Sequence, residues 1–323
     1  MTRALVVGEA VLDVVHAAGG EKGVEAGSGP GSEPSARPGG SAVNTAVALA
    51  RLGRGVDLAT AYAADAAGTV LDEHLAAARV HLAGEPHVLA STPRAVAHID
   101  ASGAASYDFE VAWALPAGVL AEPAPHVLHV TSLAPLLAPG ADDVAELVAQ
   151  LRGRTTVSYD VNLRPAITGT GVAVVEAVRR TAGLADLVKA SDEDLAALWP
   201  GDDVGASAAR LLELGPAAVV VTHGDAGASW HSRCGEDWCT GGVPGVPVRV
   251  VDTIGAGDTF SAALLDHLWP LLGAGGADRV ARLDADGWAE ALRYAVRVAA
   301  VTVSRPGADP PTRAEVDAAY PPD

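Results

Sequence analysis

Residues 252–260 read DTIGAGDTF, a glycine-rich turn that opens a helix and places one carboxylate, Asp258, in its first turn. The preceding residues 243–251, VPGVPVRVV, favour a strand, and residues 260–272 favour an apolar helix. A strand, a glycine turn and a helix aim free backbone N–H groups and the positive end of the helix dipole at one point. The sequence therefore predicts an anion site over Gly255, Ala256 and Gly257.

Asp258 needs its own explanation, because a carboxylate beside an anion hole repels the anion that it faces. One interpretation is that Asp258 only favours the helix N-terminus by its charge, or that Asp252 or Thr253 caps the helix. The other is catalytic. If the hole binds a phosphoryl group in transfer, Asp258 accepts the proton of an attacking hydroxyl while the amides stabilise charge on the phosphate.

Composition limits the class of protein. The chain has 323 residues, enough for one large α/β domain with an appendage. No apolar run is long enough to span a bilayer, and no signal peptide is evident. Its two cysteines exclude a disulfide scaffold and fit a reducing cytoplasm. The formal net charge of −18 argues against nucleic acid or an anionic membrane as partners.

Strands and helices alternate along most of the chain. A helix is expected from Ser41 to Gly53, a strand over 56–62 and a helix over 69–78. The same alternation continues with strands at 126–131, 155–160, 186–190 and 217–222, and with helices at 141–152, 171–183, 192–198 and 204–214. This order predicts a doubly wound, mostly parallel sheet with helices on both faces. Such folds place ligands at the carboxyl ends of their strands.

Two segments interrupt this alternation. Three short runs, 87–91, 95–100 and 106–111, are separated by turn residues and favour a small antiparallel sheet. Residues 17–38 are polar and glycine-rich, and alone they are typical of a disordered linker.

The stretch DTIGAGDTF resembles the C-terminal signature of the PfkB, or ribokinase-like, family of carbohydrate kinases. Residues 38–53, PGGSAVNTAVALARLG, resemble the N-terminal Gly-Gly-x-x-x-Asn-x-Ala pattern of the same family. Two motifs in the right order, about 200 residues apart, are far more specific than one glycine pattern. The resemblance covers Leu5 to about Pro311 and implies an ATP-dependent sugar kinase with a ribokinase-like fold and a small β lid. It implies a core of residues 1–14, 39–86 and 113–323 and a lid of residues 15–38 and 87–112.

The resemblance assigns the acceptor side of the site. In the family, an Asp after the first strand and the Gly-Gly-x-x-x-Asn motif hold sugar hydroxyls, which corresponds here to Asp13, Gly39, Gly40 and Asn44. Carboxylate and amide groups can bridge adjacent hydroxyls, and glycines permit close backbone approach. Without the motif, Asn44 would be interpreted as a helix-surface amide and Asp13 as a turn residue.

The segment DVNLRP at 160–165 resembles the Asp-x-Asn-x-Arg segment of fructokinase-like and ketodeoxygluconate kinase-like members. Arg164 is the candidate that compensates negative charge between the acceptor and the γ-phosphate. Asp160 and Asn162 are expected to orient substrate or a hydrated metal. The alternative is an Asx-turn beside an exposed arginine.

The nucleotide side rests on two segments. THGDAG at 222–227 resembles the family's Thr-x-Gly-x-x-Gly turn, so Thr222, Gly224 and Gly227 are expected to line the ATP site; a β-hairpin with two glycines is the alternative. Lys189 is one of only two lysines and is expected either to reach a nucleotide phosphate or to be an ordinary exposed lysine.

The metal positions depart from the family pattern. Its Asn-x-x-Glu element, which organises magnesium, is Ser191-Asp192-Glu193-Asp194 here, so Asp194 or Glu193 would supply oxygen to Mg²⁺ through water, beside nucleotide-binding Ser191. Magnesium is required on chemical grounds, because the charge of ATP must be neutralised. Some relatives also use a monovalent cation such as K⁺, for which the matching positions are Asp252, Ile254, Arg305 and Gly307.

Several alternatives stay open. His231, Cys234 and Cys239, with His223 upstream, suggest zinc, although Cys-x4-Cys is a poor spacing for a zinc knuckle. A nicotinamide-dependent oxidoreductase would need a Gly-x-Gly-x-x-Gly turn after the first strand, where the chain reads GEAVLD. A catalytically silent relative is a further alternative. Among sugars, the motifs favour a fructokinase, followed by ketodeoxygluconate kinase and then ribokinase or a nucleoside kinase. Because family lids often pair, a homodimer is also expected.

Overall fold

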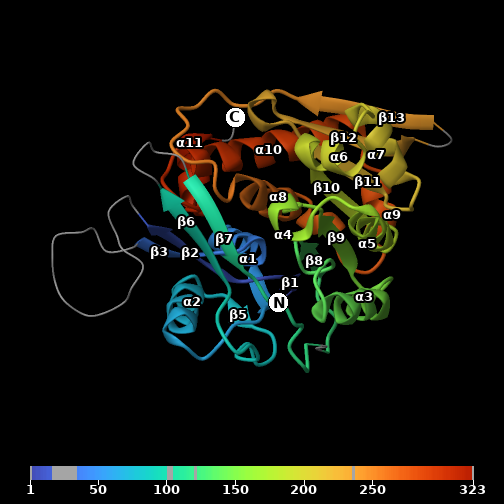
Figure 1. The fold of residues 1–323 in the computed structure, drawn as a ribbon. Helices are drawn as coiled ribbons and strands as arrows, with labels where there is room; N and C mark the ends of the chain where they lie inside the picture. Colours follow the sequence, from blue (N-terminus) through green and yellow to red (C-terminus); the bar gives the residue numbers. More distant parts are fainter. Residues whose placement is uncertain (1, 17–34, 100–104, 120–121, 235–236, 322–323) are drawn as a thin grey trace.

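The computed structural model describes residues 2–16, 35–99, 105–119, 122–234 and 237–321 (Figure 1). At its centre is a nine-stranded sheet in the order β13-β12-β11-β10-β9-β8-β1-β4-β5. All neighbours from β11 to β5 run parallel, while β12 and β13 are antiparallel. The strands are β1 (Arg3–Val7), β4 (Gly55–Ala59), β5 (His81–Leu82), β8 (Val127–Thr131), β9 (Thr156–Asp160), β10 (Leu187–Ser191), β11 (Ala218–Thr222), β12 (Ala228–Cys234) and β13 (Asp237–Val243).

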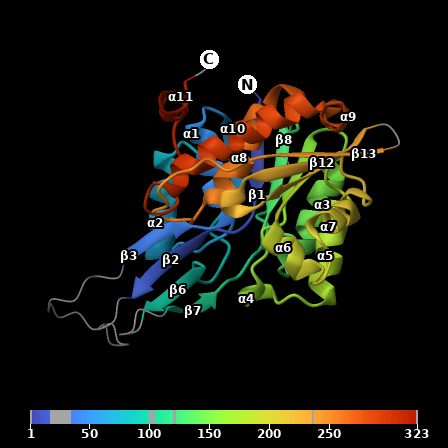
Figure 2. The ribbon, with the colours of Figure 1, turned by 90° about the horizontal axis from the view of Figure 1, so that it is seen from above.

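Helices cover both faces of this sheet (Figure 2). One apolar core lies beneath α1 (Ser41–Arg51), α2 (Ala66–Ala77), α8 (Ala256–His267) and α10 (Ala285–Val303). The other lies beneath α3 (Gly140–Leu151), α5 (Val172–Ala182), α6 (Asp192–Leu198) and α7 (Val204–Leu212). The doubly wound, mostly parallel architecture predicted from the sequence is confirmed. The shorter helical segments are α4 (Pro165–Thr168), α9 (Gly276–Ala281), α11 (Arg313–Ala319), η1 (Gly224–Ala226) and η2 (Trp269–Leu271).

A second, four-stranded sheet projects from one end of the main sheet (Figure 2). Its order is β3-β2-β6-β7, with β2 and β6 parallel and the other pairs antiparallel. Two of the three predicted runs form β6 (Arg94–Ile99) and β7 (Ala105–Glu110), whereas β2 (Val11–His16) and β3 (Ser35–Gly39) were not predicted. Residues 17–34, interpreted from the sequence as part of the lid, lie outside the described residues.

The predicted strand over 87–91 is wrong. His87 makes only an isolated bridge to Tyr62, and this segment lies against the main sheet. Pro86 and Pro93 flank the segment, and proline cannot donate to a ladder of hydrogen bonds.

The predicted strand over 243–251 is also wrong, because β13 ends at Val243 and an irregular segment follows. Pro244 and Pro247 lack the N–H groups that a strand would need. The glycine turn is therefore reached from a loop, which is held by a hydrogen bond from Val251 N to Val303 O (2.8 Å).

The fold places loops of chemical interest at one edge. The parallel strands β1, β8, β9, β10 and β11 all end at the same edge of the main sheet. The loops after those ends meet the N-termini of α1 and α8 there, and the small sheet stands over them. None of the described helices combines the length and apolarity that crossing a bilayer requires.

Candidate active site

A pocket of about 340 Å³ lies between the carboxyl edge of the main sheet and the small sheet. Its polar lining comes from segments far apart in the sequence, including Asp13, Asn44, Asn162, Arg164 and Asp258. Its apolar lining includes Val11, Ala95, Phe109, Val111, Leu133 and Ile167. A pocket lined on one side by carboxylates and amides and on the other by apolar carbon suits a small polyol.

The glycine turn at the start of α8 has a geometry that larger residues would disrupt. Gly255 has φ +75°, and a Cβ there would lie 2.7 Å from the Cβ of Ala308. A Cβ on Gly257 would lie 3.2 Å from Nζ of Lys189. The backbone therefore has no side chain at Gly255 or Gly257, as close approach of an anion requires.

The amides of this turn differ in their availability. Ala256 N donates to Thr253 O across 3.2 Å, whereas the N–H groups of Gly255 and Gly257 have no acceptor within the described residues. The expectation of three free amides is therefore corrected to two, because the turn itself uses the middle one.

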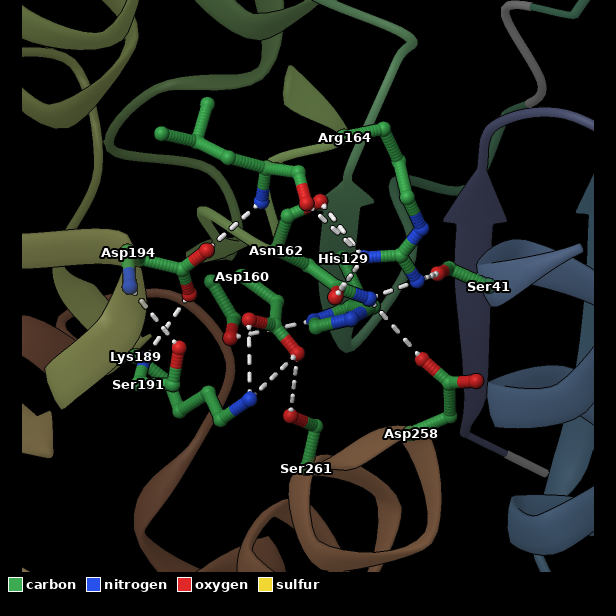
Figure 3. A network of polar contacts seen from close by, with 12 residues as sticks. Ser41, His129, Asp160, Asn162, Arg164, Lys189, Ser191, Asp194, Asp258 and Ser261 are labelled. Atoms are coloured by element: carbon green, nitrogen blue, oxygen red, sulfur yellow. Dashed lines mark hydrogen bonds and ion pairs between the residues drawn. The ribbon is translucent and has the colours of Figure 1, made fainter. Parts of the chain in front are cut away.

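Asp258 lies at the pocket floor, 5 % exposed, with both carboxylate oxygens hydrogen-bonded. Asn44 Nδ2 donates to Oδ2 (2.8 Å). Asn162 Nδ2 donates to Oδ1 (3.1 Å) (Figure 3). Two amides from different elements fix the orientation of this carboxylate. The acid faces the pocket rather than only capping α8.

Arg164 lies beside this pair at the rim of the pocket. Its Nη1 donates to Asn162 Oδ1 (2.6 Å), and its Nη2 donates to the hydroxyl of Ser41 (3.3 Å) (Figure 3). Asn162 adopts a left-handed conformation, φ +37°, which turns its amide toward the pocket. The structure thus brings together Asn44, Asn162, Arg164 and Asp258, which sequence analysis assigned to one site.

Asp13 and Gly40 line the wall next to the small sheet, and Gly39 is buried against Asp13. A Cβ on Gly39 would lie 2.3 Å from Oδ2 of Asp13, and one on Gly40 would lie 2.5 Å from the carbonyl oxygen of Glu9. Gly40 also has φ +98°, which favours glycine. Burial raises the pKa of Asp13 to about 6, opposed by the charge of Arg164.

Lys189 does not line the pocket. It is 4 % exposed, and its ammonium forms an ion pair with the fully buried Asp160, 3.2 Å from its carboxylate oxygens. Ser261 on α8 donates to the same carboxylate (2.8 Å). The expected exposed or phosphate-reaching lysine is corrected: the charge lies beneath Gly257, where it ties β10 to β9.

Burial raises the pKa of Asp160 to about 6, while the Lys189 charge opposes this shift. His129, fully buried nearby, has its pKa lowered to about 3 by burial and by the Lys189 charge. Asp160 is thus beneath the site rather than in it, which corrects its expected role of orienting substrate directly.

The magnesium element forms a helix cap. Asp194 Oδ2 accepts from Ser191 N (2.8 Å) while Ser191 Oγ accepts from Asp194 N (3.0 Å), a capping box at the start of α6. The other oxygen, Oδ1, accepts from Leu163 N (2.8 Å). Glu193 is exposed. Asp194 thus commits both oxygens to the backbone, and Glu193 is the freer carboxylate of the two.

The turn 222–227 lies next to this cap. Ser191 and Thr222 are paired at the ends of β10 and β11, so the two segments follow neighbouring strands. Gly224 has φ +55° and Gly227 φ +109°, and a Cβ on Gly227 would lie 2.1 Å from the carbonyl oxygen of Val243. Both glycines are required by the backbone of this turn.

Asp252 joins the glycine turn to the loop 305–309. Its Oδ1 accepts from Ile254 N (3.0 Å), and its Oδ2 accepts from Gly307 N (2.8 Å). The side chain of Arg305 instead forms ion pairs with Asp309 and Glu315. Asp252 thus links the segment that holds Ile254 to the loop that holds Arg305 and Gly307.

The suggested zinc residues lie on the hairpin β12–β13. Cys239 is disulfide-bonded, so the expectation of reduced cysteines is wrong for this residue. His231 Nε2 lies 3.4 Å from Ser229 Oγ, which His223 also approaches (2.8 Å). Among the described residues, no group of three histidine, cysteine or acidic side chains is arranged to hold a metal ion.

Two residues of the site were missed. Glu9 and Ser41 both line the pocket, and burial raises the pKa of Glu9 to about 7. The motif in the sequence points to Asp13 and not to Glu9, although GEAVLD as a whole follows the end of β1, where ligands bind in such sheets. Ser41 gave no signal of its own, because a serine at a helix start is ordinary.

Comparisons with known proteins agree with this geometry. A family model described as "pfkB family carbohydrate kinase" matches residues 1–315. The fructokinase of Rhizobium leguminosarum bv. trifolii is 32 % identical over 273 residues, which are 82 % of this chain and 79 % of that protein. The fructokinase of Klebsiella pneumoniae is 32 % identical over 239 residues, 72 % of this chain and 76 % of that protein.

The chain is also similar to solved structures of fructokinases. The fructokinase of Xylella fastidiosa with bound ATP has a TM-score of 0.81 and 25 % identity, covering 98 % of this chain and 97 % of that chain. The fructokinase of Vibrio cholerae O395, in a form with bound fructose, ADP and calcium ion, has a TM-score of 0.76 and 26 % identity, covering 98 % of both chains.

Proposed function

Because this chain belongs to the pfkB family of carbohydrate kinases, we propose that its pocket binds fructose and that Asp258 is the base for phosphoryl transfer. The protein is an ATP-dependent sugar kinase of the fructokinase-like kind. The observation that carries the assignment of the base is the pocket-facing carboxylate of Asp258, held by Asn44 and Asn162 beside the bare amides of α8.

The acceptor is a neutral sugar. Asp13 is a carboxyl group in the wall of the same pocket, and once ionised it opposes the carboxylate of a sugar acid such as ketodeoxygluconate. The Asp13 carboxylate also accepts hydrogen bonds from hydroxyls, as fructose requires. Asp13, Gly39, Gly40 and Asn44 hold the sugar, and Asn162 positions Asp258 and Arg164 around it. This charge arrangement favours fructose over ketodeoxygluconate.

The chemical step follows from these positions. A hydroxyl oxygen of the sugar attacks the γ-phosphorus of ATP and forms the new P–O bond. The bond from that phosphorus to the oxygen bridging the β- and γ-phosphates breaks, and ADP leaves. Asp258 accepts the hydroxyl proton, while the Gly255 and Gly257 amides and Arg164 stabilise charge on the transferring group.

Nucleotide and metal roles extend this proposal. Ser191, Thr222, Gly224 and Gly227 form the neighbouring strand ends that line the ATP site, and Lys189 supports Gly257 from beneath. Mg²⁺ would neutralise the phosphates, with exposed Glu193 supplying oxygen through water, while Asp194 holds the α6 cap. The carbonyls around Asp252, Ile254, Arg305 and Gly307 suit a monovalent cation such as K⁺.

The proposal also covers the lid, the oligomeric state and the location of the enzyme in the cell. The small sheet β3-β2-β6-β7 acts as a lid on the core, and its edge strand β7 pairs with its copy to form a homodimer. Sedimentation velocity of the purified chain tests this dimer.

Use of ATP supports a cytoplasmic location, which the Cys239 disulfide opposes, so cell fractionation decides it.

A coupled ADP-release assay tests the function. The purified chain is given fructose, ribose, ketodeoxygluconate or adenosine, each with and without Mg²⁺. We expect fructose-dependent turnover that stops when the metal is chelated. Turnover with ketodeoxygluconate above that with fructose would overturn the charge argument, and no turnover with any sugar would favour a silent binding relative.

A further inference from the structure

Glu9 is a buried acid at the active site that the proposed mechanism does not use. It follows β1, lines the pocket and is 3 % exposed. Its Oε1 accepts from Ser41 N across 3.3 Å, and its Oε2 is buried without a hydrogen-bond partner. Burying a carboxyl group is costly, so its retention here calls for a role.

The start of α1 explains one part of that role. The first amides of a helix have no partner within the helix, and a side chain at the N-cap usually satisfies one of them. Here the N-cap is Gly40, which has no side chain to do so. Glu9, in the segment after β1, therefore supplies the acceptor that α1 lacks, and its acidic group lies at the favourable end of the helix dipole.

Ser41 connects Glu9 to the catalytic groups through hydrogen bonds. While its N–H donates to Glu9, its Oγ accepts from Asn162 Nδ2 (2.6 Å) and from Arg164 Nη2 (3.3 Å). The same Asn162 Nδ2 donates to Asp258 (3.1 Å). One turn further along α1, Asn44 donates to the second oxygen of Asp258. Both amides that orient the proposed base are thus connected to the first residue of α1, Asn162 through the Ser41 hydroxyl (Figure 3) and Asn44 through the helix itself.

We propose that Glu9 is a positioning residue for phosphoryl transfer, which fixes the first turn of α1 and, through Ser41 and the two asparagines, the carboxylate of Asp258. The proposal rests on the proposed role of Asp258 as base. It implies that Glu9 acts on the chemical step more than on sugar binding, because it touches the orienting groups and not the hydroxyl that reacts.

Two substitutions at Glu9 separate hydrogen bonding from packing. Glu9→Leu fills similar space but accepts nothing, whereas Glu9→Gln keeps an oxygen acceptor for Ser41 N. We expect Glu9→Leu to lower kcat roughly 10- to 100-fold, the cost of a misplaced catalytic group, with the KM and calorimetric Kd for fructose within about threefold. We expect Glu9→Gln to keep kcat within about fivefold of the unaltered chain.

A control variant and a second test variant, at Ser41, accompany the Glu9 substitutions. Thr60→Val is the control, since Thr60 is equally buried, its hydroxyl has no partner and it lies outside the pocket lining. Ser41→Ala keeps the N–H that Glu9 binds but removes the hydroxyl, so it tests the relay even where Glu9→Leu fails to fold. We expect Ser41→Ala also to lower kcat more than it raises KM.

The double variant Glu9→Leu/Asp258→Asn distinguishes the possible failures. If Glu9 acts through Asp258, the double variant is no slower than Asp258→Asn alone. A folded Glu9→Leu protein with unaltered kcat, beside an inactive Asp258→Asn protein, overturns the role of Glu9 and leaves the base intact. A near-normal rate for Asp258→Asn overturns the base itself. Equal losses in Glu9→Gln and Glu9→Leu, matched by lost folded protein, reduce Glu9 to packing and overturn the proposal.

Discussion

Asn44 donates a hydrogen bond to Asp258 across 2.8 Å, although 214 residues separate them in the sequence. The contact joins the first turn of α1 to the first turn of α8. Two helix N-termini therefore meet at one carboxylate, and the positive ends of both dipoles lie beside it. This arrangement holds a negative group in place next to a site for a second anion.

The first prediction concerns Asp258. Asp258→Asn keeps the size of the side chain but removes the acceptor for the hydroxyl proton. We expect kcat to fall by about 10²- to 10⁴-fold, the range for loss of a general base, while the Kd for fructose changes by no more than a few-fold. Calorimetry and the ADP-release assay measure the two effects. A mutant with near-normal rate would exclude Asp258 as the base.

The second prediction concerns Asp13 and pH. Burial raises the pKa of Asp13 to about 6, so this group ionises as the pH rises from 5 to 7. An ionised carboxylate accepts hydrogen bonds from hydroxyls more strongly than a protonated one. We expect the KM for fructose to fall across that range, and Asp13→Asn to have a higher KM that does not respond to it. The same pH response in both proteins would show that another group is responsible.

The third prediction concerns the anion hole. Gly257→Ala adds a methyl group 3.2 Å from Nζ of Lys189 and beside a free amide. Alanine keeps the N–H group, but its methyl group displaces the turn. Since outright loss of one such amide costs about 10²- to 10³-fold in oxyanion holes, we expect this displacement to lower kcat at least tenfold. Gly171→Ala is the matched control, because a Cβ at Gly171 meets no atom within 4 Å. Equal rates for the two variants would contradict the proposed hole.

The fourth prediction concerns stability. Lys189→Met leaves Asp160 buried without its counter-charge. The pKa of Asp160 is raised in the folded protein to about 6 from 3.8, so its contribution to stability is present at low pH and is lost as the pH rises through 6. Without Lys189 this loss grows, and we expect destabilisation of about 3–5 kcal/mol at pH 8 and less at pH 5.

Urea unfolding at both pH values measures this effect. The double variant Lys189→Met/Asp160→Asn has neither charge of the buried pair. We therefore expect the stability difference between this variant and the unaltered chain to be nearly the same at pH 5 and at pH 8. If Lys189→Met loses the same stability at both values, the ion pair is not the cause.

The sequence predicted those parts of the molecule that local pattern controls. The alternating apolar strands and amphipathic helices specified the main sheet, and helix α6 begins and ends at the predicted residues. The two glycine motifs led to Asp258, Asn44 and Arg164 because glycine spacing reflects backbone geometry. The site roles themselves remain predictions that the variants above test.

Other features depend on contacts between distant segments. Residues 243–251 have the β-branched composition of a strand, but their prolines prevent pairing and the segment instead donates to α10. Lys189 carries no sequence signal that distinguishes an exposed lysine from one paired with Asp160. The role of Glu9 depends on its contact with Ser41 N, which lies 32 residues away in the sequence. Tertiary packing decides such cases, and a single sequence does not contain it in a form that local rules detect.

The last prediction concerns Asp252, which accepts from Ile254 N and Gly307 N and so fixes the glycine turn against the loop 305–309. Asp252→Asn keeps one acceptor oxygen, but its NH₂ group cannot accept from the second amide. The substitution also removes a negative charge beside the carbonyls that would hold a cation. We therefore expect kcat to fall about tenfold through displacement of the turn.

The ionic response separates the two effects. We expect the unaltered enzyme to be faster in potassium chloride than in tetramethylammonium chloride at equal ionic strength, and Asp252→Asn to be equally slow in both. A slow variant that still responds to potassium would mean that Asp252 only shapes the turn. An unaltered enzyme that ignores the cation would remove the monovalent site from the mechanism, because the carbonyls of residues 254, 305 and 307 would then serve only the loop.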